Sequence, residues 1–351
     1  RDAQESRGLG DVYKRQSFYL IAVFSLFFVA KYLLNESGVE KAKPRKDEDT
    51  FILSSESGQL EFYYPRDNFM VLGGAGSGKT ASIGKPILEQ YIRFGWAGFI
   101  YDYKDYDYTK TAWNLVQKYR YPYKFYYISF TDMSRTYRFN ILNKNVIRNE
   151  TMLFQAMTDF FNAMKPEKGN TDEWFQAALG LLCGVAVRFY KFQGDYEKYC
   201  TLPHILNFIL MATPEQLTRF LEGDMMSKMK AGAFLGSKGS ERTQSSVIFS
   251  INNYISNLAT NKNVCYVLSG NDFIYDLIDP EEPKLFAVSN NFAIESMISP
   301  IVAMLVPLAA RRIEFGNRVK FAFVLDEMTT VKVNDFQSLS LIHISEPTRL
   351  L

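Results

Sequence analysis

The sequence is poor in the residues that build disulfide scaffolds and zinc sites. Its 351 residues include three cysteines, Cys183, Cys200 and Cys265, and two histidines. An odd number of scattered cysteines excludes a disulfide framework, and Cys200 with His204 has no second pair nearby to complete a zinc site. An excess of one charge is also missing, because 40 basic residues stand against 38 acidic ones. Bulk charge therefore predicts no nucleic-acid binding, and any DNA contact must be local.

Apolar material, in contrast, is plentiful. Apolar residues make up 47% of the sequence and aromatic residues 15%, including 29 Phe and 22 Tyr. This composition excludes disordered and collagen-like chains and is sufficient for at least one full hydrophobic core. We expect two domains from a chain of this length.

The two ends match each other as DNA rather than as protein. Residues 6–16, SRGLGDVYKRQ, and residues 339–349, LSLIHISEPTR, read in opposite directions, can be encoded by complementary codons at all eleven pairs. Such an inverted repeat resembles a translated sequencing adapter, so we exclude residues 1–16 and 339–351 from the fold. We expect residues 17–338 to be a fragment of a longer protein.

An apolar run follows the first excluded segment. Residues 17–34, SFYLIAVFSLFFVAKYLL, are interrupted by a charge only at Lys31. This length is near the lower limit for crossing a hydrocarbon core of about 30 Å, so we predict a transmembrane helix, with a buried core helix or a signal peptide as alternatives. Basic residues are frequent in the following linker, residues 35–50, which predicts that the rest of the chain lies on the cytoplasmic side of the inner membrane.

The next segment, residues 51–142, alternates strand and helix patterns. We predict strands at 51–53, 60–64, 68–72, 98–103 and 125–130, and a helix over 81–94. Such alternation is typical of a parallel sheet covered by helices. The sequence therefore predicts the α/β class for this segment.

From residue 143 onward the pattern becomes helical. Apolar residues recur every three or four positions in predicted helices at 151–164, 171–192, 202–211, 214–221 and 240–258. We therefore predict an all-α insertion domain over 143–265. Residues 266–338 return to the α/β pattern, with predicted strands at 284–288 and 320–325 and a helix over 296–315. The insertion would thus divide one α/β domain into two parts.

Residues 73–80 carry the strongest functional motif, because they match the phosphate-loop pattern G-x-x-x-x-G-K-[ST] in full. Glycines let successive backbone N–H groups turn toward phosphates, and the positive end of the following helix faces the same anion. We predict that Lys79 reaches the β- and γ-phosphates of ATP and that the Thr80 hydroxyl binds Mg²⁺. The predicted ATP-binding residues are Gly73, Gly74, Ala75, Gly76, Ser77, Gly78, Lys79 and Thr80.

An acidic pair follows the apolar run at residues 321–325. We predict that Asp326 binds Mg²⁺ and that Glu327 is the catalytic base that polarises the attacking water. We also predict that this strand neighbours the phosphate-loop strand, directly or with one strand between. Because the biological part ends 11 residues after Glu327, we expect the fragment alone to be poorly active.

The apolar run, the phosphate loop, the helical insertion and the acidic pair follow one another along the chain. In this order they resemble the motifs of the type IV secretion coupling proteins, the TraG/TraD group of conjugative DNA-transfer ATPases. Residues 99–105, FIYDYKD, resemble the family's strand ending in Asp-Pro-Lys-Gly-Glu, with Tyr103 in place of the proline and Asp105 in place of the glycine. Residues 139–142, FNIL, are similar to its Asn-Pro-Leu turn, again without the proline. The resemblance extends over about residues 69–330.

The resemblance implies a membrane-anchored, RecA-like ATPase that assembles as a hexamer. Such a motor feeds single-stranded DNA with its attached relaxase into a type IV secretion channel, with ATP between subunits. Charge that builds on the γ-phosphate also calls for an arginine from a neighbouring subunit. The candidates for that arginine are Arg242, Arg311, Arg312 and Arg318.

Three alternative functions stay open: an ATPase for assembly of the secretion channel, a related DNA translocase, and a nucleotide-binding scaffold that does not hydrolyse ATP. The insertion mixes basic and acidic residues, which favours a protein partner over a DNA platform. Its methionines, Met225, Met226 and Met229, either serve such a partner or fill the insertion's own core. We predict that the insertion binds relaxase or an accessory protein and has weak, salt-dependent affinity for DNA.

Overall fold

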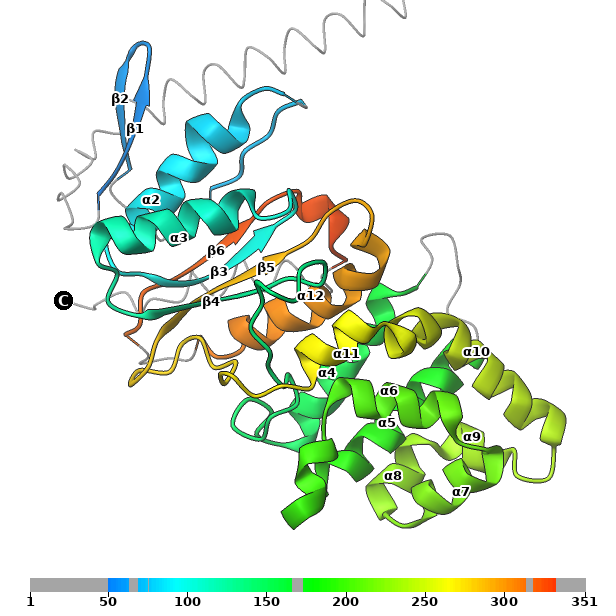
Figure 1. Cartoon of the computed structure of the whole chain (residues 1–351). Helices are drawn as coiled ribbons and strands as arrows, with labels where there is room; N and C mark the ends of the chain where they lie inside the picture. The colour runs from blue at the N-terminus through cyan, green and yellow to red at the C-terminus, as the bar shows by residue number, and fades with distance from the viewer. Residues whose placement is uncertain (1–49, 63–68, 75, 166–172, 314–317, 333–351) are drawn as a thin grey trace, which may run out of the picture. The chain divides into compact units, whose positions relative to one another are not determined.

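The computed structural model describes residues 50–62, 69–74, 76–165, 173–313 and 318–332 (Figure 1). The predicted transmembrane helix at 17–34, almost all of the linker and both adapter-like ends lie outside these residues. Within the part of the chain that the structure describes, no helix combines the length and apolar character that a membrane span requires.

A parallel sheet of four strands forms the α/β part. Its strands are β3 (Ala97–Asp102), β4 (Lys124–Ile128), β5 (Lys284–Ser289) and β6 (Phe321–Leu325), in the order β4-β5-β3-β6. All three strand pairs are parallel. Every residue of β3 and β5 is buried, as expected for central strands with helices on both faces. The predicted parallel α/β fold is therefore confirmed.

Alternation along the strands explains the two covered faces. Ile100 of β3 packs in one apolar cluster with residues of α2 (Lys85–Arg93) and α3 (Asp107–Tyr119). Phe99 and Tyr101 point to the opposite cluster. That cluster contains the apolar side of α12 (Glu295–Ala310) and much of the helical insertion, and Figure 1 shows α3 and α12 on opposite sides of the sheet.

A small hairpin, β1 (Phe51–Ser55) and β2 (Gly58–Phe62), precedes the phosphate loop. Gly58 has a φ of +127°, which a side chain would strain, so glycine suits the turn. Both strands lie where the sequence predicts them. They pair only with each other among the described residues and form no part of the four-stranded sheet.

The strand predicted at residues 68–72 is wrong for the described part of that segment. Residues 69–74 pair with no strand, and Met70 and Leu72 are 79% and 81% exposed. Phe69 instead packs on the hairpin, with its ring 5.0 Å from that of Phe62. A short apolar run becomes a strand only when a partner satisfies its backbone, and β6 pairs with β3 alone among the described residues. The predicted neighbourhood of a phosphate-loop strand and β6 is therefore also wrong.

The helix predicted over 81–94 has two parts. It begins as a π-helical turn, η1 (Thr80–Gly84), and continues as α2, which ends at Arg93. The helix predicted over 296–315 is α12, which ends at Ala310.

The described residues of the insertion, 143–165 and 173–265, form helices joined by turns and contain no strand, as predicted. Its helices are α4 (Glu150–Ala163), α5 (Glu173–Tyr190), η2 (Gly194–Tyr199), α6 (Leu202–Met211), α7 (Pro214–Glu222), α8 (Met225–Lys230), α9 (Gly232–Gly236), α10 (Glu241–Thr260) and α11 (Lys262–Leu268). Capping residues explain several of the breaks: the side chain of Thr213 accepts from the backbone N–H of Gln216, and that of Asp224 accepts from Ser227. The insertion shares one continuous core with the sheet rather than having a separate one.

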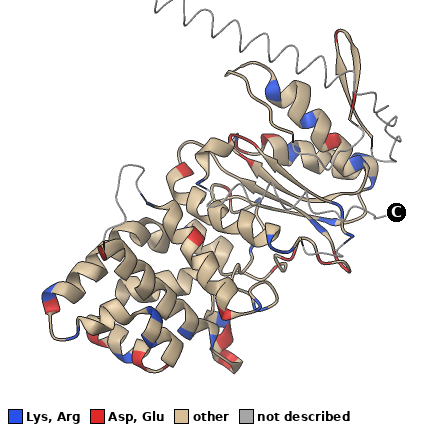
Figure 2. Cartoon of the chain, turned by 180° about the vertical axis from the view of Figure 1, so that it is seen from behind, with Lys and Arg blue, Asp and Glu red and all other residues tan. Residues whose placement is uncertain are grey.

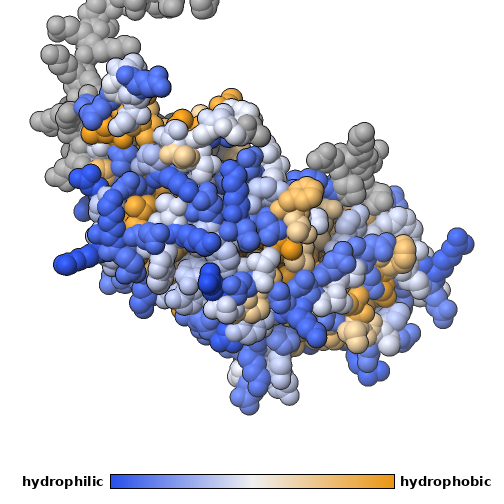
Figure 3. Space-filling model, turned by 45° about the horizontal axis from the view of Figure 1, so that its top comes forward, coloured by the Kyte–Doolittle hydropathy of each residue, from blue (hydrophilic) through white to orange (hydrophobic). Residues whose placement is uncertain are grey.

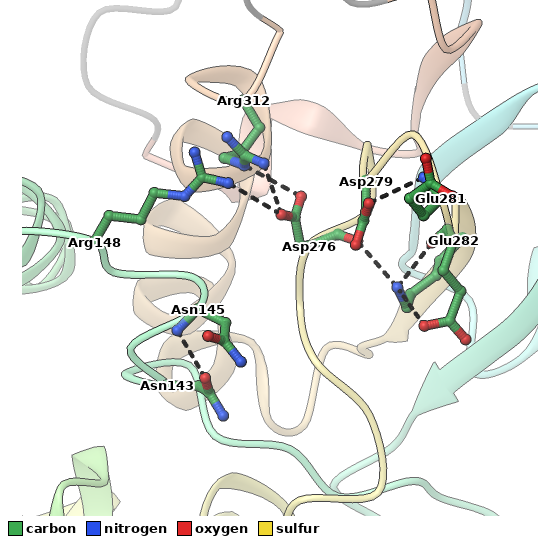
Figure 4. Close-up of polar contacts among 9 residues, drawn as sticks. Asn143, Asn145, Arg148, Asp276, Asp279, Glu281, Glu282 and Arg312 are labelled. Atoms are coloured by element: carbon green, nitrogen blue, oxygen red, sulfur yellow. Dashed lines mark hydrogen bonds and ion pairs between the residues drawn. The ribbon is translucent and has the colours of Figure 1, made fainter.

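A buried ion pair ties the loop before β5 to the end of α12. The Arg312 guanidinium donates to both carboxylate oxygens of Asp276, at 3.1 and 2.7 Å, and both side chains are about nine-tenths buried. Arg148, which is half exposed, approaches the same carboxylate at 3.8 Å (Figure 4). The two arginines thus offer unequal contacts to one carboxylate.

Replacing these two arginines tests that inequality. We expect Arg312→Met to lower the free energy of unfolding by about 3 kcal/mol, because it leaves the buried Asp276 carboxylate poorly compensated. We expect Arg148→Met to cost under about 1 kcal/mol, since its contact is long and solvent-screened. Urea unfolding of the purified variants measures both values. Equal losses would contradict this description of the pair.

Candidate nucleotide-binding site

The phosphate loop has the backbone that its glycines permit. Gly76 and Gly78 have φ values of +74° and +81°, in the region that favours glycine. A Cβ on Gly73 would come within 2.7 Å of the Ser77 hydroxyl and would displace it. The described residues 73–78 are solvent exposed, and Ala75 lies outside the described residues. An open loop with these turns is suited to an anion.

Lys79 and Thr80 begin the helical segment after the loop. The Lys79 ammonium donates to the carbonyl oxygens of Gly73 and Gly74, at 3.1 Å for Gly74. It therefore lies against the loop itself, as a phosphate-binding lysine must. The amino end of this helical segment faces the loop, which adds partial positive charge there.

Asp102 at the end of β3 is fully buried and organises the next loop. Its carboxylate accepts from the backbone N–H and the hydroxyl of Thr109, both at 2.8 Å, and from the backbone N–H of Lys104 at 3.2 Å. Burial raises its pKa in spite of these bonds. Asp102 therefore shapes the turn that carries Lys104.

Lys104 extends from this turn toward the phosphate-loop helix. Its ammonium donates to the Thr80 hydroxyl at 3.2 Å. The Asp-x-Lys pattern contains Lys104, yet the sequence alone assigns it no role, because only the fold brings residues 80 and 104 together. Lys104 is thus a site residue that sequence reasoning missed.

Asp326 lies at the carboxyl end of β6, where its backbone N–H donates to the Tyr101 carbonyl at 3.0 Å. Its Oδ2 is buried and has no hydrogen-bond partner among the described residues. Burial raises the pKa of Asp326, while the positive charge of Lys104 opposes the rise. A buried oxygen without a partner is costly, and a bound cation would supply one.

Tyr108 of α3 supports the same corner of the site. Its hydroxyl interacts with Thr80, and burial together with the Asp326 charge raises its pKa to about 12. A Cβ on Gly84 would collide with the Tyr108 hydroxyl, so the chain approaches the ring closely there. The structure thereby places Thr80, Lys104 and Asp326 in one corner.

Glu327 follows Asp326 and is exposed. Its backbone has a φ of +46°, a left-handed conformation that is uncommon outside glycine. Such a conformation at a site residue indicates that the surrounding structure holds it there.

These side chains fit a magnesium nucleotide. Mg²⁺ prefers hydroxyl and carboxylate oxygens and keeps waters and phosphate oxygens as its other ligands. Thr80 and Asp326 offer oxygens of these kinds. In the described ranges no group of three or more Asp, Glu, His or Cys could hold a metal alone. Thr80 and Asp326 would therefore hold Mg²⁺ jointly with phosphate oxygens.

Two of the four candidate arginines take part in internal ion pairs. Arg311 pairs with the buried Asp159 at 2.7 Å, and Arg312 pairs with Asp276. Arg242 and Arg318 are exposed. Of the four candidates, these two are therefore accessible at the surface of the described chain.

Cys200 and His204 both make contacts within the protein. Cys200 is buried, which raises the pKa of its thiol to about 12. One ring nitrogen of His204, Nδ1, lies 2.7 Å from the Thr201 hydroxyl.

The fold and the site together define a phosphate-loop nucleotide-binding class: a glycine loop before a helix, and a carboxylate at the end of a parallel strand. A family model described as type IV secretory system conjugative DNA transfer matches residues 24–337. The chain belongs to this family.

Several solved structures of the coupling protein TrwB have a fold similar to that of this chain. The unbound conjugative coupling protein TrwBΔN70 has a TM-score of 0.60 at 17% identity, over 85% of this chain and 64% of that one. TrwB in complex with ADP and Mg²⁺ has a TM-score of 0.61 at 17% identity, over 85% of this chain and 64% of that one. TrwB with an ATP analogue has a TM-score of 0.57 at 18% identity, over 79% of this chain and 60% of that one. This chain thus spans less than two thirds of each, and no curated protein sequence matches it.

The raised pKa of Asp326 has a consequence for stability. An acid whose pKa is raised on folding destabilises the folded state once it is ionised, so the penalty is complete above the folded pKa and disappears below the unfolded pKa. We expect Asp326→Asn to stabilise the protein at neutral pH by up to about 1 kcal/mol, after allowance for solvent screening. Thermal unfolding at pH 7 and at pH 4 measures this. A lower melting temperature for the variant at pH 7 would contradict it.

Proposed function

We propose that this chain is part of a membrane-anchored ATPase that delivers single-stranded DNA and its attached relaxase into a conjugation channel. The observation that carries the ATPase assignment is the meeting of Thr80, Lys104 and Asp326, whose buried Oδ2 has no hydrogen-bond partner among the described residues, beside the glycine loop. Membership of the conjugative DNA transfer family supports the delivery of DNA. The apolar run at residues 17–34 supports the membrane anchor.

Hydrolysis of ATP needs positioned charge more than covalent chemistry. Backbone N–H groups of the loop, Lys79 and Lys104 would offset the negative charge of the phosphates. Thr80 and Asp326 would hold Mg²⁺, which would offset further phosphate charge. Glu327 would accept a proton from the attacking water, and its exposure in the chain leaves the carboxylate accessible to it.

Two substitutions separate binding from turnover. In the full-length protein, Lys79→Ala should weaken ATP binding, because it removes a cation from the phosphate loop. Glu327→Gln should keep the ATP dissociation constant within about threefold and lower kcat by about a hundredfold or more, because it removes the base alone. Fluorescent-nucleotide titration and phosphate release measure the two effects.

The matched control for Glu327→Gln is Glu281→Gln, because Glu281 lies in the loop before the amino end of β5, away from the candidate site. This control should leave the ATP dissociation constant and kcat unchanged. Equal loss of ATP binding in the Lys79 and Glu327 variants would contradict the division of roles. Wild-type protein that binds ATP without turnover would favour the scaffold alternative. Stimulation by single-stranded DNA identifies a DNA motor, and co-purification of relaxase separates a coupling protein from other translocases.

The surface of the helical insertion fits a protein partner. Figure 2 shows basic and acidic residues interspersed over its helices rather than separated by face. In the view of Figure 3, apolar patches lie between hydrophilic side chains. Met225 and Met229, one helical turn apart on α8, are 77% and 65% exposed, so they do not fill the core. Flexible exposed methionines suit a surface that binds a partner.

Introducing charge at the exposed methionines of α8, Met225 and Met229, should weaken relaxase binding. We expect Met225→Lys combined with Met229→Lys to lower co-purification of relaxase at least about tenfold, because both side chains would leave an apolar contact. Met211→Lys is the control, since Met211 is 78% exposed on a different helix, α6. Because the insertion shares its core with the sheet, the test uses the intact protein. Tight single-stranded DNA binding by this face at about 200 mM salt, without relaxase binding, would contradict the assignment.

A further inference from the structure

The left-handed backbone of Glu327 requires something to hold it. With φ at +46° and ψ at +49°, the residue has a conformation that costs about 1 kcal/mol or more outside glycine. Its side chain lies on the surface, so side-chain packing does not fix the conformation. The contacts that fix it therefore involve its backbone.

Thr330, in the short helix η3 (Met328–Thr330), makes these contacts. Its backbone N–H donates to the Glu327 carbonyl at 2.9 Å, and its hydroxyl donates to the same oxygen at 2.8 Å. The carbonyl of Thr330 accepts from the hydroxyl of Ser299 on α12 at 2.8 Å. Thr330 thus connects the Glu327 backbone to a helix of the core.

A buried chain of hydrogen bonds orients the Thr330 hydroxyl. The Tyr101 hydroxyl lies 2.9 Å from it, and the Asn290 amide donates to the Tyr101 oxygen at 2.9 Å. Tyr101 and Asn290 are 0% and 1% exposed. The Asn290 side-chain oxygen accepts from the backbone N–H of Asn291, which fixes the orientation of the amide.

The donors and acceptors available allow these hydrogen bonds to run in one direction only, from Asn290 to the Glu327 carbonyl. The Asn290 NH₂ can only donate, so the Tyr101 oxygen accepts and its proton is available to Thr330. The Thr330 oxygen then accepts from Tyr101, and its own proton goes to the Glu327 carbonyl. Burial raises the pKa of Tyr101, which keeps that proton in place. The hydrogen bonds thereby link the residue after β5, Tyr101 of β3 and the short helix η3 that follows β6.

We propose that Thr330 is a positioning residue for Glu327, with Tyr101 and Asn290 as its support. The hydroxyl of Thr330 holds the backbone of Glu327 so that the carboxylate faces the nucleotide. This role rests on the proposed ATPase function. Small displacements of a catalytic group lower turnover strongly, so loss of the hydroxyl should affect kcat rather than nucleotide binding.

The test compares Thr330→Val with Thr330→Ser in the full-length protein. Valine keeps the shape of threonine and removes the hydroxyl, whereas serine keeps the hydroxyl. We expect Thr330→Val to lower kcat about tenfold with the ATP dissociation constant unchanged within about twofold, and Thr330→Ser to stay within about twofold of wild type. In a Glu327→Gln background, Thr330→Val should lower kcat by less than about twofold, because the group that it positions is already absent.

Tyr101→Phe provides a second variant with a matched control. It removes the middle hydroxyl of the chain and should lower kcat several-fold. Tyr121→Phe is the control, because Tyr121 is also buried and donates to the Trp96 carbonyl at 2.5 Å, at the other edge of the sheet. The control should lose stability without losing turnover of the folded protein.

Hydrogen exchange tests the contact independently of activity. Thr330→Val should speed amide exchange in the peptide that contains residues 326–332, and Thr330→Ser should not. Unchanged exchange in the valine variant, a kcat within twofold of wild type, or an equal loss in the serine variant would each overturn the proposal. Wild-type protein without turnover would instead refute the proposed function, and the exchange result would still decide whether the hydroxyl holds the loop.

Discussion

The parallel pairing of β3 with β5 and β6 is the constraint on which the site depends. Its register sets Asp102 beside Ser289, and Tyr101 beside Leu325. The carboxyl ends of the three strands therefore meet at one edge, and the residues that follow them face one another. Asp102 shapes the turn of Lys104, Asn290 reaches Tyr101, and Asp326 follows β6. Without this register, residues about 230 positions apart, such as Tyr101 and Thr330, would not meet.

Much of the fold follows from local pattern. The apolar runs at 98–103 and 284–288 predict buried strands because strands covered on both faces have no need of polar alternation. The helical spacing over 143–265 predicts the helices that are found there. The candidate site residues Lys79, Thr80, Asp326 and Glu327 can be proposed from the sequence because phosphate chemistry demands particular residue types at fixed spacing.

The remaining features depend on contacts that no local pattern contains. Residues 68–72 read as a strand, but a strand exists only with a partner, and Phe69 packs on the aromatic side chains of the hairpin instead. Lys104 and Thr330 have ordinary neighbours in sequence, and only the fold brings them to Thr80 and Glu327. The shared core of sheet and insertion is likewise a property of packing, because helix periodicity shows which face is apolar but not what covers it.

The carboxyl edge of this sheet is the proposed binding site of a magnesium nucleotide. A crystal structure of the full-length protein with ADP and Mg²⁺ tests it most directly. It should show the phosphates against the N–H groups of residues 73–80, Mg²⁺ near Thr80 and Asp326, and the Lys79 ammonium moved from the Gly73 carbonyl to a phosphate. A nucleotide bound elsewhere, with Lys79 still on the carbonyls of Gly73 and Gly74, would contradict the account.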